Sequence, residues 1–455
     1  MINRRQKSIL ILALFAGEIM MKSGAEIYRV EDTVTRICRA CKIPYVECFA
    51  TITGIFLSID SGEQDGNMHT FIKRIRGIAI DLSKISKINE FSRVFTSTDL
   101  TIEAGFQLLR EIEREKPYSL RLNLFGCLLI GASLCPCFGG GLRDSVFSAV
   151  ITGLAYLASV CIGKLQLNSF IRVFLSCAAC TLLSVVCLET GLTLTLSPVI
   201  IATITLFLPG VAITNAARDM LSGDMLSGTA RMAEAFIAAI AIAGGVGIVL
   251  KIWSLARGAL PTDAVIRYPM YLFFLFAFLT TLGFCVQFHV PKKHMVFTSL
   301  IGACGFCVYE YALLHQQGAI LGSLLGSGVV AVLAEFASRA GKDATTLFII
   351  PGIIPLVPGT GMYATMFYVL QNDFSNAAAT GSKTFIIAGS IAVSLVIVAS
   401  FARILVASSR KAGEALAALA AARAARIKKS GGAADGDPGD DGADSPPPDE
   451  TNPPG

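Results

Sequence analysis

The chain has 455 residues, of which 53% are hydrophobic and 16% are charged, and its formal net charge is +5. Soluble globular domains are about 45–50% apolar and about 25% charged, so this composition excludes an ordinary soluble protein and indicates a polytopic membrane protein. The small net charge, without a concentrated basic patch, also argues against a nucleic-acid partner.

Residues 1–120 are expected to form a small soluble, cytoplasmic α/β domain. The basic start and the apolar run after it resemble a secretory signal, but no cleavage site follows, so we expect one helix over 8–41. Glu26 and Asp32 on this helix are expected to face solvent. Residues 44–60 and 68–81 favour strands and predict a strand pair joined by a turn at 61–67.

Two helices are predicted to complete this domain, at 83–95 and 98–116, with Asp99 as the N-cap of the second. At the other end of the chain, residues 408–455 form a tail. Its first part is rich in Ala and basic residues, which favours a helix at the membrane surface. Its second part is acidic and rich in Pro and Gly, which predicts disorder.

Ten apolar stretches between these ends are long enough to cross about 30 Å of hydrocarbon. They predict a first five-helix module within 121–258 and a second within 259–407. The ten stretches are 122–138, 145–163, 173–188, 191–208, 232–253, 269–290, 295–314, 318–337, 345–370 and 384–406.

Lysine and arginine residues in the loops set the expected orientation. If residues 1–120 are cytoplasmic, the basic residues on the outer side are Arg143, Lys251, Arg257, Arg267 and Lys383, whereas many more fall on the inner side. The sequence therefore predicts a multi-pass protein of the inner (plasma) membrane with both termini in the cytoplasm.

Two apolar stretches are interrupted in the same way, by Pro209-Gly210 and by Pro358-Gly359. Each interruption falls in the fourth stretch of its module, and aligning them places Asp224 against Asp373. Because five crossings per module is an odd number, the second module is predicted to be inverted relative to the first. Inverted repeats with matching broken helices are typical of secondary transporters that bind substrate near the middle of the membrane.

A proline inside an apolar helix frees backbone groups, which at membrane depth must line a cavity or be buried in protein. The restarted helices would present amides that favour a carboxylate. The alternative is a kinked structural helix. The residues expected to contact substrate are Pro209, Gly210, Asn215, Pro358, Gly359, Gly361 and Tyr363.

The stretch 209–245 resembles the threonine/serine exporter family, often called ThrE. The matching pattern is a Pro-Gly, then Asn215, Ala216, Arg218 and Asp219, then Ser222-Gly223-Asp224, Gly228, Arg231 and Glu234. Residues 24–38 and 349–363 resemble two further parts of the family. The resemblance implies a fused form of two modules joined near 258–268, and export of small amino acids driven by the proton motive force. Split relatives are associated with dicarboxylates, so succinate-like substrates stay open. Residues 371–383 lack most of the charges of 218–234, which suggests that the second module contributes shape more than charge.

Five charged residues are candidates for proton coupling or gating: Arg218, Asp219, Asp224, Arg231 and Glu234. A buried carboxyl could carry a proton because burial favours its neutral form. The alternatives are an interfacial Arg218–Asp219 pair, a solvated Asp224, a Glu234 that reaches water, an Asn215 that only caps its helix and a Tyr363 that only packs in the core. Glu310 and Glu335 also lie at edges of apolar runs.

The sequence contains no enzyme motif, and neither a cofactor nor a metal site is predicted, although three Cys-x-x-Cys pairs occur. The expected function is proton-coupled antiport of a small amino acid by alternating access. The expected partners are the substrate, protons and the lipid membrane, with a homo-oligomer as an option. The rivals are a passive pore for small organic acids and a membrane-anchored sensor.

Overall fold

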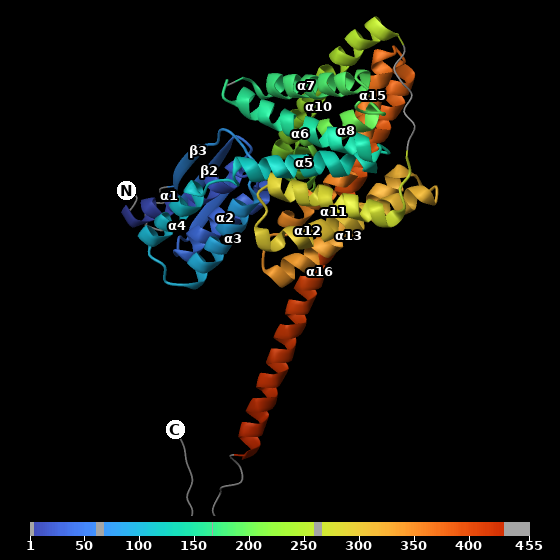
Figure 1. The fold of residues 1–455 in the computed structure, drawn as a ribbon. Helices are drawn as coiled ribbons and strands as arrows, with labels where there is room; N and C mark the ends of the chain where they lie inside the picture. Colours follow the sequence, from blue (N-terminus) through green and yellow to red (C-terminus); the bar gives the residue numbers. More distant parts are fainter. Residues whose placement is uncertain (1–3, 61–67, 166, 259–265, 432–455) are drawn as a thin grey trace, which may run out of the picture. The chain divides into compact units, whose positions relative to one another are not determined.

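The structure is a computed structural model that describes residues 4–60, 68–165, 167–258 and 266–431. It divides into two compact units at Ala399 and Ser400 (Figure 1). In the second unit the described residues are the C-terminal part of helix α16 (Phe374–Gly431). The predicted acidic tail lies outside the described residues from 432 onward. All contacts below belong to the first unit.

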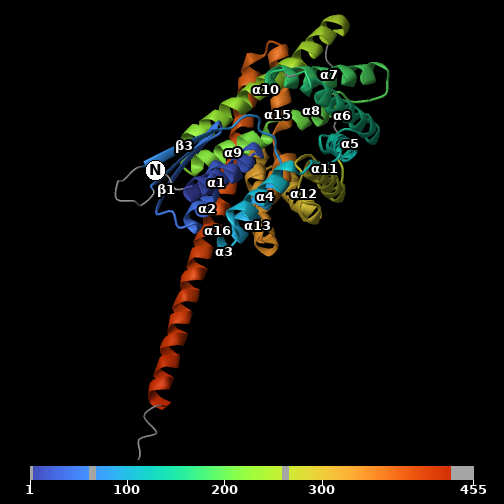
Figure 2. The same cartoon turned by 90° about the vertical axis from the view of Figure 1, so that its left-hand side faces the viewer.

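The N-terminal elements contain a three-stranded antiparallel sheet of order β1-β2-β3, on which α1 and α2 pack, while α3 and α4 pack against these two helices. Figures 1 and 2 show this group in blue and cyan beside the remaining helices. The interior includes Val30 and Val34 of one helix and Ile55, Leu57 and Ile59 of the central strand. The elements are α1 (Arg4–Lys22), α2 (Ile27–Ala40), β1 (Tyr45–Thr51), β2 (Gly54–Asp60), β3 (Met68–Arg74), α3 (Leu82–Ser97) and α4 (Ile102–Arg114).

The sheet has one more strand than the sequence predicted. Residues 44–60 form a hairpin by themselves, in which Thr51 pairs with Gly54 and only Ile52 and Thr53 make the turn. Two-residue hairpin turns are usually marked by Asn or Gly at the central positions. Neither occurs at those two positions, so the hairpin had no visible signal. The predicted turn at 61–67 lies outside the described residues.

The predicted helix over 8–41 is wrong in one respect, because it is two helices. α1 ends at Lys22 and α2 begins at Ile27, and Gly24 between them has φ +84°, in the left-handed region that glycine adopts without steric cost. The N-cap of α4 also differs from the prediction. Thr101, rather than Asp99, accepts a hydrogen bond from the Ala104 amide.

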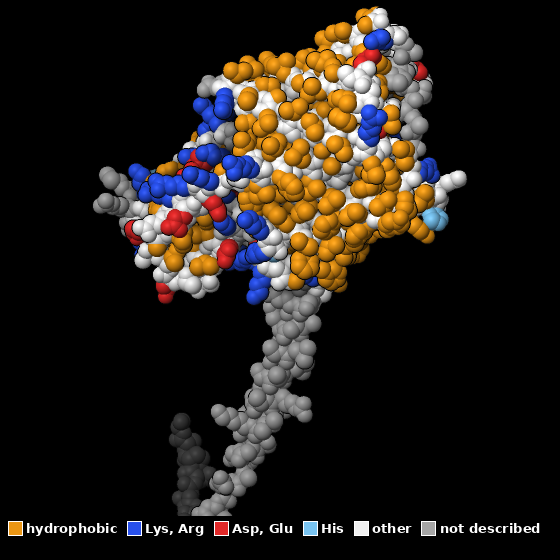
Figure 3. Space-filling model, viewed as in Figure 1, with side chains coloured by type: hydrophobic (Ala, Val, Ile, Leu, Met, Phe, Trp, Pro, Cys, Tyr) orange, Lys and Arg blue, Asp and Glu red, His pale blue; other side chains and the backbone are white. Residues whose placement is uncertain are grey.

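The next elements are apolar helices. Among the described residues, eight helices are long and apolar enough to cross a membrane, or ten if each of two bent helix pairs counts as one span. Figure 3 shows the apolar side chains covering this region, with Lys and Arg gathered beside the N-terminal elements. The eight are α5 (Leu120–Cys137), α6 (Leu142–Gly163), α7 (Ser169–Glu189), α10 (Met225–Arg257), α11 (Met270–Gln287), α12 (Lys292–Leu314), α13 (Gly318–Gly341) and the first part of α16.

The two bent pairs are the interrupted stretches that the sequence singled out. In the first, α8 (Ser197–Ile204) and the 3-10 turn η1 (Thr205–Phe207) precede α9 (Gly210–Leu221), with a bend of 55°. In the second, α14 (Thr346–Ile353) and η2 (Ile354–Leu356) precede α15 (Gly359–Leu370), with a bend of 41°.

Proline causes each break in the same way. The residue before each proline, Leu208 or Val357, is extended, as the proline ring requires of its predecessor, so the incoming helix ends there. The carbonyl of Pro209 or Pro358 then accepts the first hydrogen bond of the restarted helix. Both helices are therefore broken, as predicted.

The two modules repeat element by element. α14, η2 and α15 follow α8, η1 and α9 along the chain by one constant offset in residue number, and α16 begins after α10 by that same offset. α11 and α12 begin after α5 and α6 by nearly the same offset. Asp224 and Asp373 each directly precede the last helix of their module, which matches the alignment drawn from the sequence.

The two breaks pack against each other reciprocally. A Cβ atom placed on Gly210 would lie 3.2 Å from Ile354 Cδ1 and from Val357 Cγ2. A Cβ on Gly359 would lie 3.0 Å from Leu208 Cδ1 and 3.8 Å from Thr205 Oγ1. Because Thr205 and Leu208 are the counterparts of Ile354 and Val357, each break makes the same contact with the other.

The corresponding helices α5 and α11 lie antiparallel in contact. Gln287 near the end of α11 donates to the Asn123 carbonyl near the start of α5, at 2.7 Å. Further along the pair, the Ser133 and Thr280 hydroxyls are 2.8 Å apart. Beyond the opposite ends, the Tyr268 hydroxyl donates to the Gly140 carbonyl at 2.9 Å. Two corresponding helices thus run in opposite directions through the same layer.

Candidate functional site

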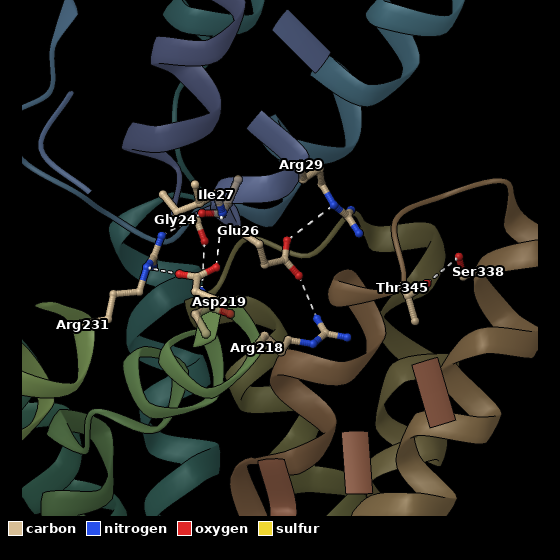
Figure 4. Close-up of polar contacts among 11 residues, drawn as sticks. Gly24, Glu26, Ile27, Arg29, Arg218, Asp219, Arg231, Ser338 and Thr345 are labelled. Carbon is tan, nitrogen blue, oxygen red and sulfur yellow. Dashed lines mark hydrogen bonds and ion pairs between the residues drawn. The ribbon is translucent and has the colours of Figure 1, made fainter. Parts of the chain in front are cut away.

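Arg218 and Asp219 of α9 and Arg231 of α10 contact the break between α1 and α2. The close-up in Figure 4 shows Arg218, Asp219 and Arg231 pointing at Gly24–Ile27. We call this set of contacts the interlock.

Two buried carboxylates and three guanidinium groups carry the charge of the interlock. Arg218 Nη1 lies 2.7 Å from Glu26 Oε1, and Arg29 Nε lies 3.4 Å from Glu26 Oε2. Arg231 Nε lies 3.0 Å from Asp219 Oδ2. Glu26 is only 1% exposed and Asp219 is fully buried, so the ion pairs are shielded from water. Such pairs respond strongly to the loss of one partner.

Backbone groups complete the interlock. Asn215 Nδ2 donates to the Gly24 carbonyl at 3.2 Å, and Arg231 Nη2 donates to the Ala25 carbonyl at 2.9 Å. The Ile27 amide, one of the unpaired donors at the start of α2, donates to Asp219 Oδ1 at 3.4 Å. The glycine break therefore exposes the carbonyls and the amide that α9 and α10 bind.

The prediction that Glu26 faces solvent is wrong. Burial by itself would raise the pKa of Glu26, but the guanidinium groups of Arg29 and Arg218 outweigh burial and hold the pKa below its ordinary value. Glu26 is therefore ionised at neutral pH inside a protein interior. Sequence periodicity missed this because the partner, Arg218, lies 192 residues away.

A second set of contacts joins the N-terminal elements to the second module. Ser86 of α3 donates to Asp343, which also lies 2.7 Å from His294 Nε2 and 3.1 Å from Lys293 Nζ. The Leu82 amide donates to the Phe288 carbonyl at 3.0 Å. The N-terminal elements thus contact one end of both modules.

The second break lies beside a cavity of about 510 Å³ at the other end of the helices. Pro358, Thr360 and Gly361 line it together with the end of α5, the segment 266–270, α12 and the start of α16. Its charged lining residues are Arg267, Glu310 and Lys383. It is within the range of about 300–1,000 Å³ that small-molecule sites occupy.

The two cavities that border the first break have no charged lining residue. Pro209 and Gly210 line a space of about 200 Å³ whose other lining residues are apolar apart from Thr205. Gly210 and Pro358 also border an apolar groove of about 670 Å³ between α9–α10 and α15–α16. The charged side chains that line these three cavities, Arg267, Glu310 and Lys383, all belong to the second module.

The other predicted site residues are scattered. Gly359 packs against Leu208 as described, and Tyr363 is buried with its hydroxyl 3.4 Å from Ser197 Oγ. Asp224 is half-buried before α10, and burial raises the pKa of its carboxyl. Glu234 is exposed on the first turns of α10. Within the described ranges, no cluster of three His, Cys, Asp or Glu residues could hold a metal ion.

Sequence reasoning named Glu310 as a weaker candidate, and it counted Arg267 and Lys383 only as outer-loop charges. Their common cavity could not be seen, because it brings together three segments that lie far apart in the sequence. One signal was present in the sequence. The stretch 251–267, predicted as an outer loop, and Lys383 hold four of the five basic residues assigned to the outer side.

Comparison with known proteins agrees with the sequence and the fold. The ThrE family model for threonine/serine exporters matches residues 11–253, more than half of the chain. The chain belongs to the threonine/serine exporter family. A second model, described as "Threonine/Serine exporter, ThrE", matches residues 273–401 of this family member. The gap between the matches contains the predicted module boundary, so the fused two-module form is confirmed.

Individual relatives are distant. The "Threonine/serine exporter" of Corynebacterium glutamicum is 21% identical over 81% of this chain and 78% of its own length. The "Probable threonine/serine exporter" of Mycobacterium tuberculosis is 21% identical over 82% of this chain and 72% of its own length. The "Probable succinate transporter subunit YjjP" of Escherichia coli is 26% identical over 56% of this chain and 98% of its own length. No solved structure matches the chain.

Proposed function

We propose that this chain exports threonine and serine across the inner membrane by proton-coupled antiport, with alternating access around the two broken helices. The observation that carries the proposal is the reciprocal contact of the breaks, in which Gly210 packs against Val357 and Gly359 against Leu208. Two like elements in equivalent contact can exchange roles when a transporter changes the side to which it opens.

Two observations support an inverted relation of the modules. The corresponding helices α5 and α11 are in antiparallel contact, and the N-terminal elements contact segments of the two modules that do not correspond to each other. The N-terminal elements contact residues 215–231 of the first module and 288–294 of the second. The counterparts of 288–294 in the first module, 138–144, lie instead near Ile266, whose amide donates to the Gly139 carbonyl at 2.9 Å. Corresponding segments at opposite ends are what inversion requires.

The gating role proposed for Arg218, Asp219 and Arg231 takes a specific form. Their buried contacts with Gly24–Ile27 hold the N-terminal domain over the ends of α9 and α10. The cavity beside Pro358 lies at the other end of the helices. With the N-terminal domain in the cytoplasm, this arrangement corresponds to a form closed inside and accessible from outside. Asp224 and Glu234 are the proposed proton carriers, and both lie beside the interlock in sequence.

A dicarboxylate such as succinate is the second candidate substrate. It is favoured by the match to the succinate transporter subunit and by the two cations, Arg267 and Lys383, that line one cavity. A third candidate function is that of a sensor anchored by its membrane helices. The interlock is compatible with this function too, because it joins the N-terminal domain to those helices. Deleting residues 1–115 separates the sensor from an exporter, because an anchor has no flux to lose.

The test is efflux of preloaded radiolabelled threonine, serine and succinate from proteoliposomes, with and without an imposed pH gradient. Gradient-dependent loss of threonine or serine is the expected result. Loss of succinate alone would indicate that the substrate is a dicarboxylate. Flux that does not depend on the pH gradient would indicate a passive pore. No flux of any of the three contradicts transport.

A further inference from the structure

The cavity at the second break carries charges of both signs on different walls. Arg267 comes from the segment before α11, Glu310 from the last turns of α12 and Lys383 from the first turns of α16. Among the described residues, no lysine or arginine nitrogen lies within 4.0 Å of the Glu310 carboxylate, although the Arg267 guanidinium is near enough to act on it electrostatically. The three charges are therefore apart from one another and available to a molecule between them.

The remaining lining is suited to a small solute rather than a lipid. Thr360 and Thr380 carry hydroxyl groups and Tyr309 carries a phenol among apolar walls, while the hydroxyls of Tyr268 and Thr384 donate to backbone carbonyls and can still accept a hydrogen bond. A few placed polar groups among apolar walls are what small-molecule sites have in common.

Glu310 has no equivalent in the first module. Val160 occupies the same position in α6, counted from Leu142, that Glu310 occupies in α12, counted from Lys292. A carboxylate in an apolar wall of a membrane helix is costly unless something offsets its charge. The repeat therefore does not account for a carboxylate at position 310. A cationic group on a bound ligand would account for it, because that group would offset the negative charge of Glu310.

We propose that this cavity is the substrate site and that Glu310 binds the α-ammonium group of the amino acid, while Lys383 and Arg267 bind its carboxylate. Glu310 is then the residue that selects an amino acid over a carboxylic acid without an amine. A dicarboxylate would place a second negative charge against Glu310, which costs binding energy through like-charge repulsion. This assignment rests on the proposed function and names the substrate contacts within it.

The experiment compares serine with glycerate, which carries a hydroxyl where serine carries its ammonium. Binding of both is measured by titration calorimetry on the full-length purified protein, for the wild type, Glu310→Gln, Lys383→Gln and the control Glu335→Gln. Glu335 lies on the neighbouring helix α13, where it pairs with Arg339 at 3.9 Å and lines none of these cavities. Elution volume and melting temperature report whether each variant folds.

The wild type and Glu335→Gln are expected to bind serine at least tenfold more tightly than glycerate. Glu310→Gln is expected to abolish that preference by weakening serine alone, and Lys383→Gln to weaken both ligands to a similar degree. A Glu310→Gln protein that folds and keeps its preference within twofold overturns the assignment, even if the wild type transports serine. A wild type that neither binds nor transports any of the substrates tested above contradicts the proposed function itself, so the two failures are distinguishable.

Discussion

At the scale of the residue, the feature that decides most is Glu26. It is a carboxylate on a chain break, buried against two arginines, one of which comes from the membrane region. An ion pair removed from water depends on both partners, because each charge left alone keeps its full desolvation cost. Replacing one charged residue of the interlock without its partner is therefore expected to destabilise the contact.

Glu26→Gln is expected to destabilise the protein markedly, because it leaves Arg218 buried beside a neutral partner. Breaking a buried pair costs about 3–5 kcal/mol, and loss of an exposed helical pair costs about 0.3–0.5 kcal/mol. The control is Asp32→Asn, whose pair with Arg36 on the same helix is exposed. The measurement is the melting temperature in detergent. Equal shifts for the two variants would mean that the interlock is not important for stability.

The interlock is also expected to respond to acid in one direction. The pKa of Glu26 is held below its ordinary value, so its contribution is fully present above the unfolded pKa of about 4.3 and is lost as the pH falls through the folded value. The melting temperature should stay level from pH 8 to about pH 5 as far as Glu26 is concerned and fall below about pH 4. Because Glu26→Gln has nothing to titrate there, the difference between wild type and variant should shrink in the same range. A difference that grows on acidification would contradict the assignment.

For proton coupling, Asp224→Asn and Glu234→Gln are expected to leave the protein folded and to abolish efflux that depends on a pH gradient. Each change removes a proton-binding carboxylate and keeps the size of the side chain. The measurement is threonine efflux from proteoliposomes with and without the gradient. Unchanged gradient-dependent efflux in both variants would rule out these carboxylates as the proton carriers.

At the scale of the element, the two broken helices depend on close approach as much as on proline. Pro209 and Pro358 end the incoming helices, and the small residues that follow let the restarted helices touch their neighbours. The clearest case is Gly361 on α15, where a Cβ atom would overlap Thr384 Oγ1 of α16 beside the cavity. Overpacking of this kind typically costs about 1–3 kcal/mol.

Gly361→Ala is therefore expected to slow threonine efflux by tenfold or more, since α15 must shift away from α16 at the cavity. Adding Thr384→Ala should restore part of the rate by making room. The matched control is Gly389→Ala on α16, where an added Cβ would contact nothing within 4 Å. Efflux from proteoliposomes and the melting temperature are measured for all three proteins. A Gly361→Ala rate equal to that of the control would show that the contact is not critical.

At the scale of the whole molecule, four of the five basic residues predicted on the outer side either bind a neighbouring group or line the cavity. Arg143 Nη2 donates to the Gly191 carbonyl at 2.6 Å, Arg257 Nη2 lies 2.8 Å from Glu189, and Arg267 and Lys383 line the cavity. These basic residues lie on the side that has few Lys and Arg residues, and their contacts or their place at the cavity give each a reason to be there. The bias itself predicts that both termini lie in the cytoplasm.

That orientation can be tested by joining a reporter protein to the C-terminus and measuring on which side of the membrane the reporter lies. Green fluorescent protein joined there should fluoresce, because it folds in the cytoplasm. Alkaline phosphatase joined there should be inactive, because it is active only on the outer side of the membrane. A control fusion of phosphatase within 259–265, the predicted outer loop, should be active. The reverse pattern would invert the topology and make the cavity open to the cytoplasm.

The sequence by itself determined the class of protein, the family and the two breaks. These follow from composition and from the local chemistry of proline, which acts on its own helix whatever surrounds it. It also determined most of the helices, since apolar runs of this length have few alternatives. It missed the hairpin at Ile52-Thr53, whose central positions carry neither Asn nor Gly, and the break at Gly24, because a single glycine in an apolar helical pattern does not by itself mark a helix end.

Only the tertiary structure decided what the charged residues do. Arg218, Asp219 and Arg231 at the end of an apolar run look the same in a sequence whether they meet water, lipid headgroups or a buried carboxylate. Their contacts with Gly24–Ile27, far away along the chain, turn them from expected pathway residues into parts of the interlock. Conversely, Arg267, Glu310 and Lys383 become a single site only when three segments bring them around one cavity. Charge is visible in a sequence, but its partner is fixed by packing.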